Sequence, residues 1–347
     1  MGAAIDRATI DAMRRFLKRP SPAELERIGV EVEAAAVRFG TEGWLDEPAS
    51  FHLDPPPLTE PRVRGISGGP TPFEWVSWES GFRPHGVSPG RARWESYRQN
   101  QVARAAVLRH RDATRPWVVC IHGFGMGRPL LDMLAFRAAR LHHKLGLNVA
   151  LPVLPLHGVR RTERLSRFAG FPSVDMMDNV HAASQAAFDV RRLITWIRSH
   201  GPELVGVQGL SLGGFTTALV ASLEDDLAFA GPLIPAADLA TLLADAADDE
   251  RSAELDAGPV IETATTVLRV VAPLQMTPRV PHDRRYVIAG TVDGMARPSQ
   301  HAEPLWEHWG RPAIKWYHGS HAAVFWARGI GTFLESVWTD AGVLPAR

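Results

Sequence analysis

The sequence predicts an α/β fold in which helices cover both faces of a mostly parallel central sheet. Between residues 117 and 238, short apolar runs alternate with segments of helical periodicity. Strands that alternate with helices of this length form parallel sheets with crossover helices. The run WVVCI at residues 117–121 is apolar throughout, as expected of a strand buried on both faces.

Size and composition indicate a globular protein with no affinity for nucleic acid. Of the 347 residues, 45% are hydrophobic and 22% are charged, which suits a chain with a large core. Lys plus Arg and Asp plus Glu each number 38, so no net charge attracts a nucleic-acid partner. The only cysteine, Cys120, excludes a disulfide within the chain and suits a buried strand in a reducing compartment.

Location and source are predicted from the same features. The N-terminal sequence MGAAIDRATIDAMRRFLKRP lacks the apolar core of a secretory signal. No segment offers the roughly 18 uninterrupted apolar residues of a transmembrane helix. We therefore expect a cytoplasmic protein and leave open both peripheral contact with a membrane surface and the oligomeric state. The many Ala and Arg residues indicate a bacterial origin.

Residues 1–60 are predicted to form an N-terminal helical arm. Apolar residues recur at helical spacing in IDAMRRFL. A second helix is expected over SPAELERIGVEVEAAAVRF, because Ser21 suits the N-cap, Pro22 the first helical position and Glu24 a capping box. The proline-rich stretch DEPASFHLDPPPLTEP marks the end of this arm.

The main α/β domain is predicted in two parts, residues 61–238 and 281–347. Strands are expected at FEWVSWESGF, ARAAVLRHR, WVVCI, NVALPVLPLHG, ELVGVQG, LAFAGPLIPAAD, RRYVIAGTVDG and AIKWYHGSH. Helices are expected at PLLDMLAFRAARLHHKLG, VDMMDNVHAASQAAFDVRRLITWIRSHG, SLGGFTTALVASLEDD, HAEPLWEHWG and AAVFWARGIGTFLESVWTDAG. Residues 239–280 interrupt the alternation with two or more helices and an acidic patch, so we predict a cap over the sheet.

The segment GLSLGG places Ser211 at a sharp turn between a predicted strand and a predicted helix. Gly209 and Gly213 stand two residues before and after it, where a side chain would collide with the neighbouring strand and helix. Such a turn holds the serine at strained dihedral angles, and the following helix points its first N–H groups towards it. The pattern alone is weak evidence, but this context predicts that Ser211 is a nucleophile.

A serine nucleophile needs a base, and the base needs an acid that fixes its tautomer. His321 follows the last predicted strand and is the expected base, with His318 as a less favoured candidate. Asp293, in the turn TVDG after the next-to-last strand, is the expected acid, and Asp238, one strand earlier, is the alternative. In a parallel sheet these positions share the carboxyl edge with Ser211.

Two backbone N–H groups are expected to stabilise an oxyanion. One belongs to Leu212, directly after the nucleophile, and the other to Phe124 in the HGFG segment after WVVCI. His122 and Gly123 of that segment are candidate substrate contacts. Glycine there allows the backbone to approach a substrate closely.

The segment PLHGVRR supplies further candidate substrate contacts, His157, Arg160 and Arg161. Arginine binds a carboxylate or phosphate through two hydrogen bonds, so one interpretation is a substrate with an anionic head group. The alternative, which we favour, is an ion pair between Arg160 or Arg161 and an acid such as Asp175 or Asp178.

Over roughly residues 62–340, the chain resembles the α/β-hydrolase superfamily. Four signals agree: HGFG, GLSLGG, an acid after the next-to-last strand, and GSH near the end. The order Ser211, Asp293, His321 is that of the superfamily. Within it, PLHGVRR, DVRRLITWIRSHG and IPAADL are similar to prokaryotic relatives of abhydrolase domain-containing protein 18. The resemblance implies the α/β-hydrolase fold, with its cap inserted after the strand that follows the nucleophile helix.

The expected activity is hydrolysis of a carboxylic ester through an acyl-enzyme, as in a serine esterase or lipase-like enzyme. No metal or organic cofactor is expected, because clustered Cys and His spacings of metal sites are missing from the sequence. The apolar stretch VIETATTVLRVVAPL in the cap favours a lipid ester among small-molecule substrates. Two alternatives remain: an acyltransferase on the same triad, and a non-catalytic binding protein of this fold.

Overall fold

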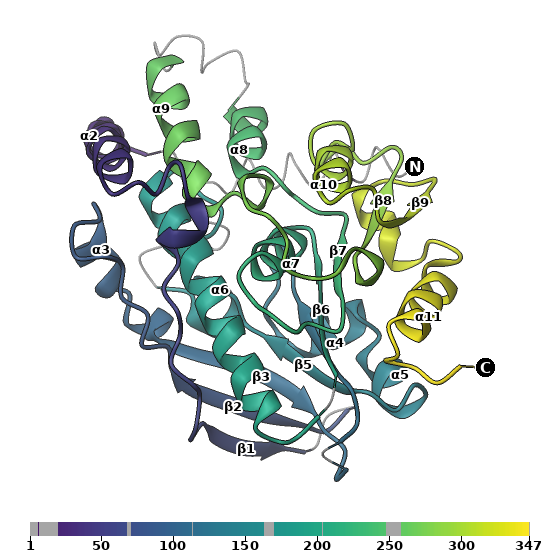
Figure 1. Cartoon of the computed structure of the whole chain (residues 1–347). Helices are drawn as coiled ribbons and strands as arrows, with labels where there is room; N and C mark the ends of the chain where they lie inside the picture. The colour runs from purple at the N-terminus through teal and green to yellow at the C-terminus, as the bar shows by residue number, and fades with distance from the viewer. Residues whose placement is uncertain are drawn as a thin grey trace.

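A nine-stranded sheet forms the centre of the computed structural model, which describes residues 6, 20–67, 71–112, 114–162, 170–202, 204–247 and 258–346. The strands lie in the order β1-β2-β3-β5-β4-β6-β7-β8-β9 (Figure 1). Neighbours from β1 to β5 pair antiparallel, and neighbours from β5 to β9 pair parallel. The predicted mostly parallel sheet is therefore confirmed.

The strands and helices have the following bounds. The strands are β1 (Arg62–Ile66), β2 (Phe73–Glu79), β3 (Val102–Leu108), β4 (Trp117–Ile121), β5 (Asn148–Pro152), β6 (Val205–Leu210), β7 (Ala230–Leu233), β8 (Tyr286–Gly290) and β9 (Ala313–Tyr317). The α-helices are α2 (Pro22–Thr41), α3 (Arg91–Glu95), α4 (Pro129–Ala135), α5 (Ala138–His143), α6 (Met176–Arg198), α7 (Leu212–Ala221), α8 (Leu239–Ala247), α9 (Gly258–Leu268), α10 (Ala302–His308) and α11 (Ile330–Asp340). Short 3₁₀ helices are η1 (Pro48–Phe51), η2 (Arg98–Gln101), η3 (Gly158–Arg160), η4 (Arg269–Val271), η5 (Pro273–Gln275), η6 (His282–Arg284) and η7 (His321–Phe325).

Helices cover both faces of the sheet, and alternate residues of β4 face two separate cores. Trp117, Val119 and Ile121 belong to the core that includes α6 and α7. Val118 and Cys120 belong to the core that includes α4, α5 and α11. A strand with an apolar core on each face needs an unbroken apolar sequence, which explains the run WVVCI.

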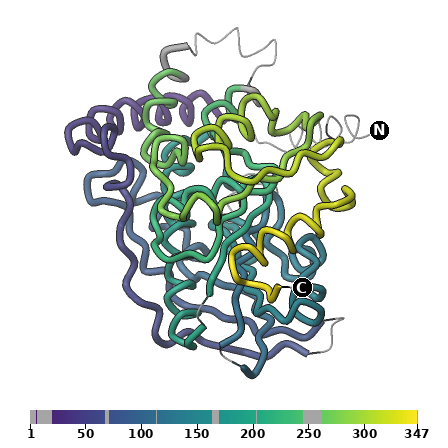
Figure 2. The backbone as a smooth tube through the Cα atoms, turned by 45° about the vertical axis from the view of Figure 1, so that its right-hand side comes forward, coloured from purple at the N-terminus to yellow at the C-terminus, as the bar shows by residue number. Residues whose placement is uncertain are grey.

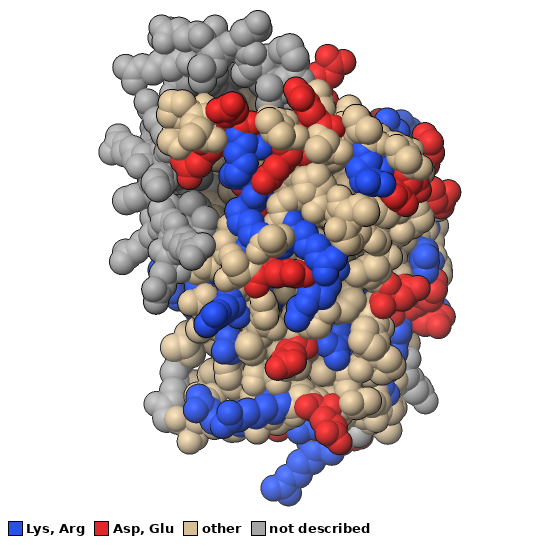
Figure 3. Space-filling view, turned by 90° about the vertical axis from the view of Figure 1, so that its left-hand side faces the viewer, with Lys and Arg blue, Asp and Glu red and all other residues tan. Residues whose placement is uncertain are grey.

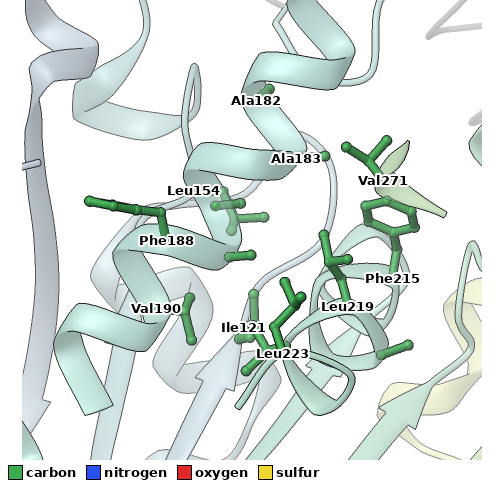
Figure 4. Close-up of a cluster of buried hydrophobic side chains, with 14 of the residues drawn as sticks. Ile121, Leu154, Ala182, Ala183, Phe188, Val190, Phe215, Leu219, Leu223 and Val271 are labelled. Carbon is green, nitrogen blue, oxygen red and sulfur yellow. The ribbon is translucent and has the colours of Figure 1, made fainter. Parts of the chain in front are cut away.

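The first of these cores fixes the position of α7, the helix that follows Ser211. Figure 4 shows Leu223, directly after α7, beside Ile121 of β4, and Phe215 of α7 beside Val271 from the segment that follows α9. All of these side chains are buried. Burial of one such side chain contributes about 1.5–3 kcal/mol, so the start of α7 is held rigidly between the sheet and the inserted segment.

The helix predicted after Ser21 is confirmed as α2, and its capping box is formed. The Ser21 N–H donates to Glu24 Oε2 (2.7 Å), and the Glu24 N–H donates to Ser21 Oγ (3.3 Å). α2 buries Val32 and Phe39 in the core shared with α6 and α9, and it lies beside α9 in both views (Figures 1 and 2). The arm thus packs on its own domain. The helix predicted at IDAMRRFL lies outside the described residues.

Ion pairs tie α2 to α3 and α6. Arg93 of α3 binds Glu31 of α2 (2.6 Å) as well as Asp175 (3.0 Å) and Asp178 (3.1 Å) at the start of α6. Basic and acidic side chains are interspersed on this face of the molecule (Figure 3).

Two predicted helices are each broken in the structure. The helix expected at residues 129–146 is divided into α4 and α5, because Arg137 between them adopts a left-handed backbone (φ 50°). The Arg137 guanidinium donates to the carbonyl of Phe325. The one expected at residues 322–342 is divided into η7 and α11 by Gly329, whose φ of 79° is also left-handed.

α3 was not predicted at all, since its surroundings indicate strands. In the inserted segment, α8 and α9 agree with the two predicted helices.

Candidate active site

Ser211 lies on a sharp turn between β6 and α7, as the sequence predicts. Its backbone has φ 54° and ψ −110°, a conformation that costs a residue with a side chain about 1–3 kcal/mol. Backbone hydrogen bonds hold it there. The Ser211 N–H donates to the carbonyl of Leu233 (2.9 Å), and the Ser211 carbonyl accepts from Phe215 (3.0 Å) and Ala236 (3.2 Å).

The two flanking glycines are required by close packing of backbone against backbone. A Cβ at Gly213 would lie 1.9 Å from the carbonyl oxygen of Ile121, and one at Gly209 would lie 2.1 Å from the carbonyl oxygen of Gly213. Neither neighbour is a flexible side chain that can move aside. The glycines of GLSLGG therefore let α7 start directly against β4 and β6.

The substitution Gly213→Ala is expected to lower the free energy of unfolding by more than about 3 kcal/mol, because it forces a Cβ into a backbone carbonyl. In an unobstructed helix the same change would stabilise by about 1 kcal/mol. Chemical denaturation measures the difference. Gly29→Ala, inside α2 with no atom within 4 Å of the new Cβ, is the matched control. Equal stability of the two variants would contradict the packing described here.

The loop after β4 lies directly beside Ser211. β4 and β6 pair in parallel with Ile121 opposite Gly209, so the two chains leave the sheet at the same level. A Cβ at Gly123 would lie 3.6 Å from the Cβ of Ser211. Because Gly123 has no side chain, the backbone of this loop can lie in contact with the turn that carries Ser211.

The two predicted oxyanion donors come from the elements that meet at this point. Leu212 is the first residue of α7, and the first N–H groups of a helix have no acceptor within it. Phe124 follows Gly123 in the loop after β4, and its ring contacts the His157 ring with centroids 6.0 Å apart.

His122 holds this loop in place from inside the protein. Its Nε2 accepts the N–H of Leu154 (3.0 Å), so the proton of the neutral ring is on Nδ1, which donates to the carbonyl of Gly123 (2.8 Å). Burial lowers the pKa of His122 to about 4, and the neutral form persists at neutral pH. Both ring nitrogens are thus bound within the protein, in contrast to the expected contact with a substrate.

A buried carboxyl group, which sequence reasoning missed, also supports the loop. Asp132 of α4 is 1% exposed, and its Oδ1 accepts the N–H of Gly127 (3.2 Å). Burial raises the pKa of Asp132 from 3.8 to about 7, although the hydrogen bonds from Gly127 and Arg128 act in the opposite direction. In the sequence Asp132 is an ordinary polar position of an amphipathic helix, so no local signal marks it.

Asp132 is expected to make stability depend on pH. A carboxyl group whose folded pKa is raised stabilises the fold below its unfolded pKa, and this contribution is lost as pH rises through the folded pKa. The contribution of Asp132 to the unfolding free energy, taken as the difference between the wild type and Asp132→Asn, should therefore fall by a few kcal/mol between about pH 4 and pH 7. Asp132→Asn removes this dependence while keeping an acceptor for Gly127. Denaturation of both proteins across this range measures it, and parallel curves would contradict the expectation.

The predicted acid and base meet at the carboxyl edge of β8 and β9. These strands are parallel neighbours, with Gly290 opposite Tyr317, and Asp293 and His321 follow three and four residues later. Asp293 Oδ2 lies 2.6 Å from His321 Nδ1. Asp293 is 5% and His321 8% exposed, so the pair is largely shielded from water.

The Asp293 carboxylate is fixed by two further bonds. Its Oδ1 accepts the N–H groups of Met295 and Ala296, each at 2.9 Å. Because the Asp293 carboxylate accepts from Nδ1, that nitrogen carries the proton and Nε2 of His321 is free to act as a base.

The two alternative candidates lie elsewhere. Asp238 caps the start of α8: its Oδ1 accepts the N–H of Ala240 (2.9 Å) and its Oδ2 accepts the hydroxyl of Thr241 (2.7 Å). His318 is bound to the hydroxyl of Thr291 (3.2 Å) on an exposed surface. The structure pairs His321 with Asp293 and leaves these two residues outside that pair.

Among the described residues, no hydrogen bond joins the Ser211 hydroxyl to the His321 ring. The structure brings Asp293 to His321 and Ser211 to the loop after β4, but it does not close the contact between these two halves. Contacts of this kind are often long without substrate and tighten in the substrate complex.

In the PLHGVRR segment, Arg160 forms a buried ion pair, which is the interpretation that we favoured over a substrate contact. Arg160 is fully buried and its partner is Asp189 (2.7 Å), whereas Asp175 and Asp178, the acids suggested as examples, pair with Arg93. Its guanidinium also donates to the carbonyls of Val153 (2.9 Å) and Asn100 (2.8 Å).

The other two candidates of this segment differ from each other. Arg161 is exposed. His157 is 4% exposed, and its Nδ1 donates to the carbonyl of Pro155 (2.9 Å). Its Nε2 is buried without a hydrogen-bond partner among the described residues, and burial lowers the pKa of His157 to about 3.

The described part of the chain offers neither a cluster of metal ligands nor a helix that could span a membrane. Within it, no three His, Cys, Asp or Glu side chains gather as a metal site would require. None of its helices has the length and apolar character needed to cross a membrane.

Comparison with known proteins gives close relatives and more distant folds. No family model matches the chain. Two proteins of Mycobacterium tuberculosis, uncharacterized protein MT2702 of strain CDC 1551 / Oshkosh and uncharacterized protein Rv2627c of strain ATCC 25618 / H37Rv, are 43% and 42% identical to it. Each alignment spans 327 residues, 92% of this chain and 77% of the relative.

Among solved structures, three esterases have a similar fold. An acetyl xylan esterase from Paenibacillus sp. R4 has a TM-score of 0.56 at 13% identity and covers 86% of this chain and 99% of its own. Acetyl xylan esterase 1 from Thermoanaerobacterium sp. JW/SL YS485 has a TM-score of 0.55 at 14% identity, with coverages of 96% and 98%. A cold-adapted esterase from an Arctic intertidal metagenomic library has a TM-score of 0.52 at 14% identity, with coverages of 82% and 100%. At these identities the likeness shows the fold, which is that of the α/β hydrolases.

Proposed function

We propose that this chain, which belongs to the same family as the two Mycobacterium tuberculosis proteins, is a serine hydrolase that cleaves carboxylic esters through an acyl-enzyme. One observation carries the proposal. The strained Ser211 and the Asp293–His321 pair stand at the same edge of the sheet, each directly after a parallel strand.

The reaction starts with attack of Ser211 Oγ on the ester carbonyl while His321 Nε2 takes the hydroxyl proton. Substrate binding brings the Ser211 hydroxyl and the His321 ring into hydrogen-bond range. Asp293 holds the Nδ1 proton and stabilises the imidazolium. His321 then protonates the leaving alcohol, and in the second half it activates a water molecule that releases the acid and regenerates Ser211.

The tetrahedral intermediate carries an oxyanion, which the backbone N–H groups of Leu212 and Phe124 stabilise. Donors fixed in advance are worth about 3–4 kcal/mol each in such sites. The fixed position of the loop supports this role, since His122 and Asp132 bind it from below.

An ester with an apolar acyl group is the proposed substrate, and a lipid ester is the finer proposal. The apolar sequence of the inserted segment supports it. The hollow between that segment and α7 has Phe215, Leu268 and Leu274 in its lining together with Asp238, Arg269 and Gln275, and it does not include Ser211 or His321. Ester cleavage is the default because an alcohol leaves more readily than an amine. The cap role of residues 239–280, the cytoplasmic location and the similarity to prokaryotic relatives of abhydrolase domain-containing protein 18 remain predictions.

Release of p-nitrophenol from esters of graded acyl length tests the proposal. We expect turnover by the wild type and a preference for acyl chains longer than acetyl. Added acceptor alcohols separate the alternatives: a hydrolase releases free acid in plain buffer, whereas an acyltransferase needs the alcohol for rapid turnover. A folded protein that binds esters without either reaction would favour the non-catalytic alternative.

A further inference from the structure

Asp6 belongs to no motif, yet its side chain lies between the loop that carries the acid and the loop that carries the base. The residue is 1% exposed. Its Oδ2 accepts the N–H of Gly294 (3.0 Å) and the N–H of His321 (2.9 Å). Its Oδ1 accepts the N–H of Ala322 at 3.5 Å. One buried carboxylate thus joins the residue after the acid to the base itself.

Successive hydrogen bonds join the loop after β8, which carries Asp293, to the loop after β9, which carries His321. Next to the sheet, the Thr291 N–H donates to the carbonyl of Tyr317 (3.0 Å) and the Val292 N–H to that of Gly319 (3.2 Å). Further out, the loops are joined through side chains, by the bond between Asp293 and His321 and by the bonds of Asp6. The Asp6 bonds therefore act where the backbone ladder has ended and the imidazole must be aimed.

We propose that Asp6 is a positioning residue of the triad, which fixes the His321 backbone relative to the acid loop and thereby aims the ring at Ser211. The inference rests on the proposed function. Hydrogen bonds from N–H groups to a carboxylate are roughly twice as strong as bonds between neutral groups. A shift of about 1 Å in a catalytic group lowers the rate by about 100-fold, so loss of these bonds acts on the chemical step more than on substrate binding.

The test compares Asp6→Ala and Asp6→Asn with the wild type in hydrolysis of one p-nitrophenyl ester. Rates are divided by the concentration of active sites, titrated with a fluorophosphonate. We expect kcat of Asp6→Ala to fall by about 10- to 100-fold while KM changes less than about twofold. Asp6→Asn should lie between, since its amide oxygen still accepts but forms only neutral hydrogen bonds.

The matched control is Asp112→Ala. Asp112 also accepts a backbone N–H, that of Thr114 (3.0 Å), but in the exposed loop before β4, at the opposite edge of the sheet. Its kcat and KM should equal those of the wild type.

The outcomes separate this inference from the proposed function. If folded Asp6→Ala keeps a kcat per active site within twofold of the wild type, the positioning role is overturned, even if its melting temperature drops. If Asp6→Ala does not fold, an unchanged kcat of Asp6→Asn overturns it in the same way. If the folded wild type neither reacts with the fluorophosphonate nor cleaves esters, the proposed function fails, and this inference with it.

Discussion

Ser211→Ala is expected to reduce ester hydrolysis by about 10⁴-fold or more, because removal of a serine nucleophile leaves only the oxyanion donors and substrate binding. The change keeps Cβ and leaves every backbone bond of the turn intact, so the free energy of unfolding should change by less than about 1 kcal/mol. Steady-state kinetics on a p-nitrophenyl ester and chemical denaturation measure the two effects.

Ser222→Ala is the matched control for this variant. Ser222 follows α7, is 2% exposed, and donates its hydroxyl to the carbonyl of Ala218 (3.2 Å). It therefore tests the loss of a buried hydroxyl on the same helix without touching the turn, and its activity should stay near that of the wild type. A Ser211→Ala protein with more than a tenth of wild-type activity would exclude the acyl-enzyme mechanism.

Asp293→Asn should lower kcat by about 10³- to 10⁴-fold, because an amide in place of the carboxylate favours the wrong tautomer of the base. The bonds from Met295 and Ala296 go to Oδ1, so the Asn oxygen can keep them. The Asn NH₂ group then donates to Nδ1 of His321, so the ring proton lies on Nε2. With Nε2 already protonated, it cannot accept the proton of the Ser211 hydroxyl.

Asp238→Asn, at the alternative acid, is the variant with which Asp293→Asn is compared. Asp238→Asn keeps an oxygen that can cap α8, since Asn and Asp cap helices about equally well, and it leaves the His321 tautomer unaffected. We expect kcat within tenfold of the wild type. A larger loss from Asp238→Asn than from Asp293→Asn would mean that the acid had been assigned to the wrong strand.

The sequence predicted those parts of the site that depend on a few neighbouring residues. Ser211, Asp293 and His321 each follow an apolar run by a short turn, and the register of a parallel sheet then brings the three turns to one edge. The capping box at Ser21 and Glu24 is equally local, and it formed as predicted.

Features that depend on distant contacts were not predictable in this way. The break at Arg137 is held by a bond to Phe325, 188 residues away, whereas the local sequence there favours one continuous helix. Arg160 pairs with Asp189 of α6 because both face the same buried space, and charge alone does not distinguish Asp189 from Asp175 or Asp178.

Asp6 illustrates the same limit in the site itself. It lies 315 residues from His321, and a single aspartate near the N-terminus has no local pattern that marks it. Only the folded structure shows that its carboxylate accepts the N–H groups of Gly294 and His321.

The central claim, an activated serine at the turn after β6, is tested most directly by a fluorophosphonate probe and mapping of the modified residue by mass spectrometry. The account predicts one adduct, on Ser211 of the folded wild type, with no adduct in Ser211→Ala and much slower modification in His321→Ala. A folded wild type that forms no adduct, or that is modified at another residue, would contradict it.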